Sequence, residues 1–372
     1  MVWLTIKSHI VNVLQADIFK LPAVPKPLPG KFLRGWVTPI LLGVLFGSNQ
    51  FLPAAPSALR GNLGVHDPST VIPCNGRYYV YYTGQGILSK SSSDLKYWSA
   101  GPSVFVNPPN WTTNAVPGFT GNIWAPDVIY FNGVYHLYYA VSTFGSQVSA
   151  IGLATSPTLD PTDPSYLWTD QGPVIESTTG SAYNCIDPSV TFDASSNLWM
   201  SFGSFWNGIY MVQLDSSTGL INASNPGRIH EAFNNASGDP IEASYLYQHG
   251  NYYYLFVNWG SCCQGPRSTY NIRVGRSKTV TGPYLDKAGV DLLHSGGSVF
   301  LATTNGPLIG PGHAATLSAQ GKEWFTSDFE GDIRMNGRAT LAIMPLQWNP
   351  DGWPEAIIND LKTIPPAAPA VK

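Results

Sequence analysis

A pattern that returns at intervals of 55 to 71 residues constrains the fold of this 372-residue chain more than any other feature of its sequence. Each unit begins with a polar residue, continues as a short apolar run, turns, and ends in a run rich in aromatic residues. The leading polar residues of the five units are Asp67, Asp127, Asp187, Glu242 and His313. Because self-similarity at a fixed period is the signature of repeat architectures, we expect a fold built from one repeated supersecondary unit.

The turns within the units are typical of β-hairpins. They are Asn75–Gly76, Asn132–Gly133, Asp193–Asn197, His249–Asn251 and Gln320–Lys322. Asn-Gly between alternating apolar runs is a strong hairpin signal. Further strands, "AIGLATS", "GIYMVQL" and "YNIRVGRS", close the second, third and fourth units, and no segment shows sustained helical periodicity. Five similar units of three or four strands predict an all-β protein, a five-bladed β-propeller.

The innermost strand of a propeller blade starts near the central channel, so the five leading polar side chains are expected to meet at one end of that channel. The competing interpretation is structural, because an Asp at a strand start also binds the amides of a nearby turn. Asp127, which follows Pro126, fits the structural role best. The Glu and His of the fourth and fifth units fit it less well, since a purely structural repeat would keep one residue type.

The composition limits the classes of partner and compartment. Charged residues make up only 12% of the chain and the net charge is −3, so nucleic acid is not expected as a partner. None of the four cysteines has the spacing of a metal site. N-glycosylation sequons at Asn110, Asn222 and Asn235, with the low charge and the even cysteine count, favour a secreted protein.

Residues 1–60 differ from the rest of the chain. Basic residues precede an apolar run from Trp36 to Phe46, which "LPAAPSALRG" follows. This order is that of a secretory signal, although it begins late in the chain. A membrane anchor and a wrongly assigned start of the coding sequence are the alternatives. We therefore divide the chain into this extension, a propeller domain at residues 61–360 and a Pro/Ala-rich tail at residues 361–372.

A ring of carboxylates could hydrolyse a glycosidic bond, which needs two carboxyl groups in opposite protonation states. Glu242 is long enough to protonate a leaving oxygen while Asp67 holds a water across the channel. Opposite walls of a channel suit the separation of roughly 6.5–9.5 Å that inversion requires. A third carboxylate, Asp187, would raise the pKa of the acid by like-charge repulsion.

Several short motifs occur in order between residues 60 and 355. They include "HDPS", "WAPDV", "YYAVSTFGS", "IDPSV", "FGSFW", "YYYLFVNWG" and "GPGH". With them the chain resembles glycoside hydrolase family 43, close to its arabinan endo-1,5-α-L-arabinosidases. The resemblance implies a five-bladed propeller that inverts the anomeric centre, with Asp67 as general base, Asp187 as the acid that tunes the pKa and orients, and Glu242 as general acid. It also implies that His313 helps to hold a metal ion, usually calcium, largely through water.

Six residues near the inner strands are candidates to contact a sugar: Trp124, Phe144, Asn184, Ser204, Trp206 and Arg338. The aromatic side chains could stack on sugar faces, and packing between blades is the alternative. The Asn and Ser could bind a sugar or a metal-bound water, or satisfy a blade turn. The Arg could bind sugar hydroxyls or Asp187, or form an ordinary structural ion pair.

The four cysteines fall into two groups. The resemblance to arabinanases implies a disulfide between the adjacent Cys262 and Cys263, and two free thiols are the alternative. Cys74 and Cys185 lie beside inner strands and are expected to be free and buried.

Together these features predict a secreted, monomeric, inverting glycosidase that cleaves α-1,5-linked L-arabinan, a side chain of pectin, without an obligate protein partner. The loop "GSCCQGPRSTYNIRVGRS" is short for the family, which leaves endo against exo action open. An α-L-arabinofuranosidase or a β-xylosidase of the same fold is the runner-up. A sugar-binding propeller without catalysis and a scaffold propeller for protein partners are the remaining alternatives.

Overall fold

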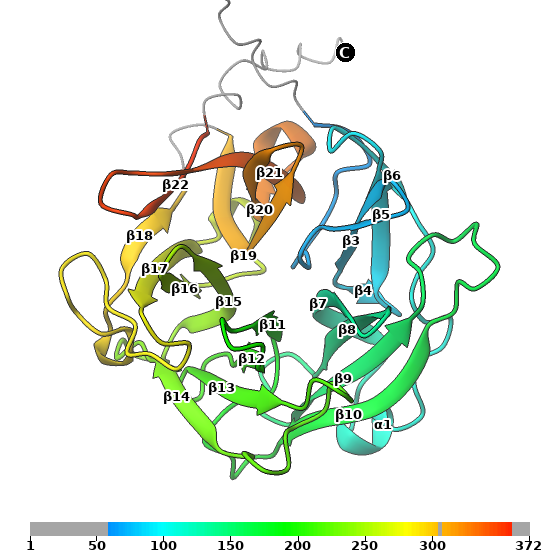
Figure 1. The fold of residues 1–372 in the computed structure, drawn as a ribbon, viewed down its shortest axis with the longest axis horizontal. Helices are drawn as coiled ribbons and strands as arrows, with labels where there is room; N and C mark the ends of the chain where they lie inside the picture. Colours follow the sequence, from blue (N-terminus) through cyan, green and yellow to red (C-terminus); the bar gives the residue numbers. More distant parts are fainter. Residues whose placement is uncertain (1–58, 304–306, 359–372) are drawn as a thin grey trace, which may run out of the picture. The chain divides into compact units, whose positions relative to one another are not determined.

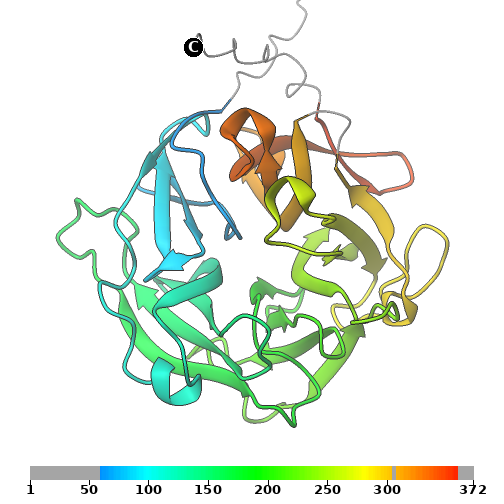
Figure 2. The same ribbon diagram turned by 180° about the vertical axis from the view of Figure 1, so that it is seen from behind.

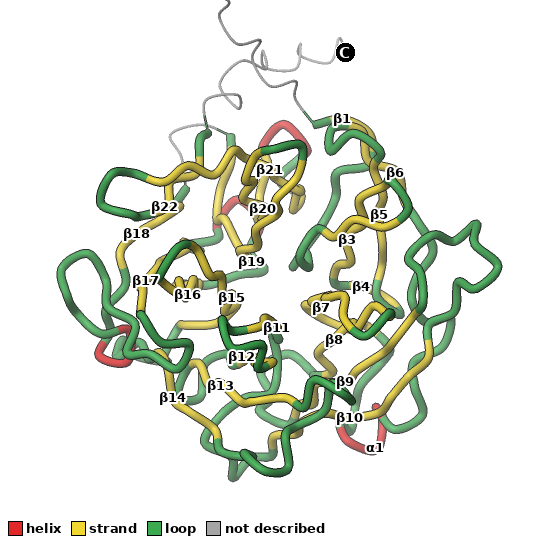
Figure 3. Tube along the Cα trace, viewed as in Figure 1, coloured by secondary structure: helices red, strands yellow, loops and turns green. Residues whose placement is uncertain are grey.

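The computed structural model describes residues 59–303 and 307–358 of the chain. Five mainly antiparallel sheets stand as blades around a central axis, as Figure 1 shows and Figure 2 repeats from behind. Strands and loops make up nearly all of this part, with only a few short helical turns (Figure 3). The all-β, five-bladed propeller predicted from the repeat is therefore confirmed.

The first two sheets have five strands each. The strand order of the first is β1 (Arg60–Gly61), β6 (Tyr97–Ala100), β5 (Leu88–Ser92), β3 (Arg77–Tyr82) and β2 (Ile72–Cys74). The order of the second is β10 (Thr169–Ser177), β9 (Ser149–Ser156), β8 (Val134–Val141), β7 (Asn122–Phe131) and β4 (Gly84–Gln85).

The other three sheets have four strands each, in simple sequence order. The third is β11 (Ser189–Phe192), β12 (Leu198–Phe202), β13 (Ile209–Leu214) and β14 (Arg228–Ala232). The fourth is β15 (Ile241–His249), β16 (Tyr252–Trp259), β17 (Asn271–Ser277) and β18 (Ser298–Leu301). The fifth is β19 (Leu308–Ala319), β20 (Lys322–Asp332), β21 (Arg338–Trp348) and β22 (Pro354–Ala356).

Helical segments of the described chain are short. They are α1 (Thr112–Ala115) and the 3₁₀ turns η1 (Gly265–Arg267), η2 (Leu292–His294) and η3 (Ile333–Met335). All five predicted hairpin turns join the first two long strands of a blade, so the turn chemistry was a sound guide to the strand boundaries. The described part contains no helix with the length and hydrophobicity of a transmembrane segment.

Buried apolar clusters fill each contact between neighbouring blades. Tyr81 of the first blade and Leu137 of the second share one such cluster, and Trp98 and Leu341 share the one between the first blade and the fifth. Burying one such side chain contributes about 1.5–3 kcal/mol, whereas an exposed ion pair contributes about 0–1 kcal/mol. In the described chain only one ion pair, Arg334–Asp332, involves Lys or Arg, so apolar contacts hold the blades together.

The ring closes where the described chain begins. The backbone N–H of Leu341 in β21 donates to the carbonyl of Leu63 at 2.9 Å, and the N–H of Val65 donates to the carbonyl of Ala339 at 3.3 Å. The segment between β1 and β2 of the first blade therefore pairs with the fifth blade, which joins the two ends of the propeller.

Polar side chains bind the inner strands of adjacent blades to one another. Asp127 accepts the backbone N–H of Thr70 in the first blade at 3.1 Å and that of Val190 in the third at 2.9 Å. Ser189 in turn accepts from Leu246 of the fourth blade at 3.4 Å. The carboxylate of Asp127 is thus a structural link across three blades, as its sequence context indicated.

The five leading polar residues do not occupy equivalent positions. Each unit has one non-glycine residue with left-handed backbone near the start of its inner strand, and these residues are Asp67, Ala125, Asp187, Ala243 and His313, with φ between 32° and 56°. Glu242 lies one residue before this point and Asp127 two residues after it. The prediction that all five converge is therefore wrong for Asp127, whose side chain points to neighbouring strands.

Residues 1–58 of the predicted extension at residues 1–60, and the whole predicted tail at residues 361–372, lie outside the described residues. The signal, anchor and tail assignments made for them therefore remain predictions.

Replacing Asp127 with Ala is expected to lower the free energy of unfolding by about 2–5 kcal/mol, because two buried N–H groups lose their acceptor. Chemical denaturation measures this loss. Asp94→Ala is the matched control, since Asp94 also accepts two backbone N–H groups, from Lys96 and Tyr97, but is exposed, so that water can replace it. Equal losses in the two variants would contradict the structural link.

Candidate active site

One cavity of about 750 Å³ lies among the inner strands, and residues from all five blades line it. Among the lining residues are the four predicted catalytic and metal-site residues Asp67, Asp187, Glu242 and His313. The predicted sugar contacts Trp124, Phe144, Asn184, Ser204 and Trp206 also line it. The convergence inferred from the repeat therefore holds for four of the five leading polar residues, and the five sugar-contact candidates line the same cavity.

Left-handed backbone is the local feature that positions three of the polar side chains. Asp67, Asp187 and His313 have φ values of 52°, 56° and 47°. Such values are uncommon for residues other than glycine, although Asp and His adopt them more readily than most. Glu242 directly precedes the left-handed Ala243, at a bulge in the β15–β16 ladder, and bulges re-aim side chains next to active sites.

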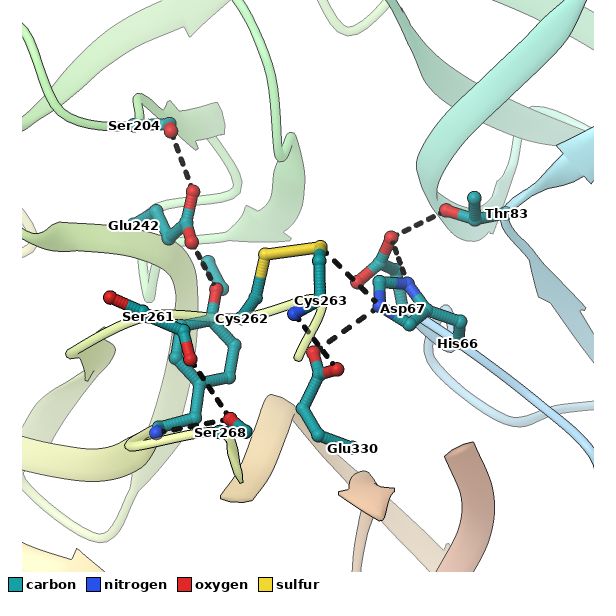
Figure 4. Close-up of a disulfide and its surroundings, with 12 residues drawn as sticks. His66, Asp67, Thr83, Ser204, Glu242, Ser261, Cys262, Cys263, Ser268 and Glu330 are labelled. Carbon is teal, nitrogen blue, oxygen red and sulfur yellow. Dashed lines mark hydrogen bonds and ion pairs between the residues drawn. A yellow bond between two sulfur atoms is a disulfide. The ribbon is translucent and has the colours of Figure 1, made fainter. Parts of the chain in front are cut away.

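Asp67 is held by three neighbours. Thr83 donates its hydroxyl to Oδ2 at 2.5 Å, and Nδ1 of His66 lies 2.7 Å from the same oxygen (Figure 4). Nδ1 of His313 lies 3.1 Å from Oδ1. Burial opposes the charged form of this carboxyl, but the charges of His66 and His313 outweigh it and hold the pKa of Asp67 well below its usual range. Asp67 is therefore a carboxylate at neutral pH.

His313 lies between two carboxyl groups. Its Nδ1 faces Asp67, and its Nε2 lies 3.7 Å from Oδ1 of Asp187. Burial favours the neutral ring, but Asp67 and Asp187 outweigh it and raise the pKa of His313 well above its usual value. Oδ2 of Asp187 accepts the backbone N–H of Ala243, next to Glu242, at 3.0 Å. This series of contacts connects the first, third, fourth and fifth blades.

Glu242 has the opposite protonation preference. Ser204 donates to Oε2 at 2.6 Å (Figure 4). The hydroxyl of Tyr270 donates to Oε1. Burial first, and then repulsion by Asp187, raise the pKa of Glu242 to about 7, while the two hydroxyl donors pull it down. A large fraction of Glu242 therefore carries a proton near neutral pH while Asp67 does not.

Two aromatic residues of the cavity are unusually accessible. The side chain of Phe144 is 84% exposed and that of Trp206 is 38% exposed, so neither packs between blades. Both belong to loops at the cavity, where an apolar ring can bind the face of a sugar.

The polar candidates have more specific partners than the sequence indicated. Ser204 donates to Glu242, and Asn184 is buried and accepts a hydrogen bond from Ser149 at 2.7 Å. Arg338 is exposed at the start of β21 and is not among the residues that line the cavity. Its predicted contact with a sugar or with Asp187 is therefore not supported.

Three residues that contact the acids were not identified from the sequence: His66, Thr83 and Tyr270. His66 precedes Asp67 in the "HDPS" motif, and this position next to a predicted catalytic residue could have identified it. Thr83 and Tyr270 stand in strand-rich runs that contain many similar residues, so no local pattern distinguishes them.

The predicted states of the cysteines are confirmed. Cys262 and Cys263 form a disulfide at the wall of the cavity (Figure 4). Cys74 and Cys185 are free and buried.

A cavity that brings together two carboxyl groups of opposite protonation preference has the pair of groups that most glycosidases use. Comparison with known proteins agrees with this class. The model of glycosyl hydrolases family 43 matches residues 62–354, and the chain belongs to this family.

Characterised relatives resemble most of the chain. The extracellular endo-α-(1→5)-L-arabinanase 1 of Bacillus subtilis is 40% identical over 87% of this chain and 97% of its own length. The extracellular exo-α-(1→5)-L-arabinofuranosidase ArbA of Cellvibrio japonicus is 39% identical over 80% of this chain and 87% of its own. A solved α-L-arabinanase of Cellvibrio cellulosa, in complex with arabinohexaose, has a TM-score of 0.76 and 36% identity, covering 81% of this chain and 97% of its own.

Replacing Asp187 with Asn is expected to lower the pKa of Glu242 below about 7, because a like charge beside it is removed. NMR titration of the labelled Glu side chains measures this shift. Asp163→Asn, in a turn away from the cavity, should leave the pKa unchanged. An unaltered pKa in Asp187→Asn would mean that burial alone keeps Glu242 protonated.

Proposed function

We propose that this chain is a secreted inverting glycosidase that hydrolyses α-1,5-linked L-arabinan by endo cleavage. One observation carries the proposal: Asp67 and Glu242 line the same cavity, and their pKa values are displaced in opposite directions. Pairs of titratable groups whose surroundings push their pKa values apart are the mark of an acid and a base. The extracellular arabinan-cleaving relatives support both the substrate and the compartment.

The roles follow from the protonation states. Glu242 gives its proton to the glycosidic oxygen that leaves. Asp67 accepts a proton from a water molecule whose oxygen attacks the anomeric carbon on the opposite face, which inverts the configuration. Exchange with solvent then returns both carboxyl groups to their starting states. Asp187 keeps Glu242 protonated through its charge and holds the adjacent backbone through the amide of Ala243.

Several cavity residues would bind the sugar chain rather than react. The exposed rings of Phe144 and Trp206, with Trp124, offer apolar surfaces on which arabinofuranose rings can lie.

Ser204 and Tyr270 hold the carboxyl group of Glu242 in one orientation. A general acid must be fixed within hydrogen-bonding reach of the atom that it protonates.

A second candidate, exo cleavage, is supported by the relative from Cellvibrio japonicus, which is nearly as similar as the endo-acting one. The products formed from linear arabinan separate the two. Endo cleavage yields a mixture of oligosaccharides and a rapid loss of viscosity, whereas exo cleavage yields one short product at nearly constant viscosity. Activity on aryl arabinofuranosides or xylosides alone would favour the arabinofuranosidase or β-xylosidase alternative.

Glu242→Gln and Asp67→Asn should each lower kcat on linear arabinan by about 10²- to 10⁴-fold, because general acid and base catalysis each contribute roughly that much. Release of reducing ends measures kcat, and near-ultraviolet circular dichroism checks the fold. Wild-type turnover in either variant would remove that residue from the mechanism.

The pH dependence of hydrolysis should follow the protonation of Glu242. Because Glu242 must be protonated and its pKa in the free enzyme is about 7, kcat/KM is expected to fall as the pH rises above that value.

A calcium ion near the axis is the further part of the proposal. Asp328 is buried, and neither of its carboxylate oxygens has a hydrogen-bond partner among the described residues. Calcium prefers oxygen ligands, so these atoms fit it. The ring nitrogens of His313 already face Asp67 and Asp187, so His313 would approach the ion through water rather than directly. Bound there, the cation would supply positive charge that offsets the surrounding acids.

Treatment with a calcium chelator is expected to lower the melting temperature, and added Ca²⁺ should restore it, because ligands that bind only the folded state stabilise it. Differential scanning calorimetry measures both steps. Asp328→Asn should abolish the response to chelator. A wild-type melting temperature that does not respond to either treatment would argue against a bound calcium ion.

A further inference from the structure

A buried acid outside the three proposed catalytic residues is connected to the proposed base. Glu330 lies in β20 of the fifth blade and is only 4% exposed. Its Oε1 lies 3.2 Å from Nε2 of His66, and its Oε2 accepts the backbone N–H of Cys263 at 3.0 Å. Among the described residues no Lys or Arg forms an ion pair with Glu330, so His66 is its cationic neighbour.

The imidazole of His66 connects two carboxyl groups. Its Nδ1 lies 2.7 Å from Oδ2 of Asp67, and its Nε2 faces Glu330 (Figure 4). The disulfide also contacts this ring, because Sγ of Cys263 lies 3.8 Å from Nε2 of His66. The backbone amide of Cys263, Glu330, His66 and Asp67 therefore form a continuous series of polar contacts that runs from the disulfide loop to the proposed base.

The orientation of Asp67 explains why such a series matters for hydrolysis. An ionised carboxylate has about four acceptor sites. Thr83 and His66 occupy Oδ2, and His313 faces Oδ1. About one acceptor site of the Asp67 carboxylate therefore remains open, and a water molecule can donate its proton there. A base held this way keeps the direction of that site fixed, provided that His66 is itself held in place.

We propose that Glu330 is a positioning residue for the hydrolytic reaction, which fixes the ring of His66 and, through it, the carboxylate of Asp67. The inference rests on the proposed role of Asp67 as general base. Glu330 does not touch the substrate in this scheme. The backbone N–H of Cys263, in the disulfide loop, donates to Glu330 and so helps to fix its carboxylate.

Glu330→Gln keeps the size of the side chain but removes its charge. We expect kcat on linear arabinan to fall about 10- to 100-fold with KM changed less than about threefold, because small displacements of a catalytic group reduce turnover rather than binding. Glu323→Gln is the matched control. Glu323 lies on the same strand and accepts hydrogen bonds from Tyr247 and Trp348, but none of its partners contacts Asp67, so kcat should stay within about twofold of wild type.

A second variant tests whether Glu330 acts through His66. In His66→Gln the amide can still reach Glu330, but the contact with Asp67 is removed. If Glu330 acts through His66, the double variant should be no slower than His66→Gln alone, since the single losses of coupled residues do not add. If the fold loss in kcat of the double variant equals the product of the two single losses, Glu330 does not act through His66. That result would overturn the proposal even though Glu330→Gln alone is slow.

A substrate with a good leaving group distinguishes the base side from the acid side. On a nitrophenyl α-1,5-arabinotrioside the leaving group needs no proton, so Glu242→Gln should recover most of its activity. Glu330→Gln should keep its full loss, because attack by water still depends on Asp67. If Glu330→Gln recovers its activity on this substrate, or if it has the wild-type kcat on arabinan, the inference about Glu330 is overturned while the proposed function stands. A wild-type protein inactive on both substrates would instead overturn the proposed function.

Discussion

The structure depends on how the innermost strand of each blade satisfies backbone groups that have no further strand to pair with. Buried N–H groups without an acceptor are costly, so each must find one. Here side chains of adjacent blades provide the acceptors: Asp127 serves Thr70 and Val190, and Asp187 serves Ala243. The same requirement that holds the ring together thus also places one carboxyl group of the cavity, that of Asp187, directly beside Glu242.

Much of the architecture could be predicted because it depends on local signals. Asn-Gly turns and alternating apolar runs fixed the hairpins, and the repeated units fixed the number of blades. The convergence of Asp67, Asp187 and Glu242 followed from topology, since equivalent strands start at the same axis. Exposed aromatic residues in loops rich in Gly and Ser, such as Phe144 and Trp206, were also found correctly, because a core residue would need apolar neighbours in sequence.

The failures all involve side-chain direction or contacts between distant blades. A displacement of two residues along the inner strand turns Asp127 away from the cavity, and only the backbone conformation at Ala125 reveals that displacement. Arg338 opens β21, the third strand of its blade, and it is exposed and outside the cavity. Tyr270 and Glu330 act on residues of other strands or other blades, so no spacing in the sequence could have paired them with Glu242 or His66.

The pairing of Leu63 and Val65 with β21 has a consequence for how the chain reaches this fold. Each blade is a meander of neighbouring strands and can form locally, but this last pairing joins residues from the two ends of the described chain. Contacts of such high sequence separation form slowly, because the entropy of closing a long loop must be overcome first. Until then, the apolar faces that Trp98 and Leu341 share in the native state remain open to solvent. The unclosed ring is therefore the species most prone to aggregate during biosynthesis.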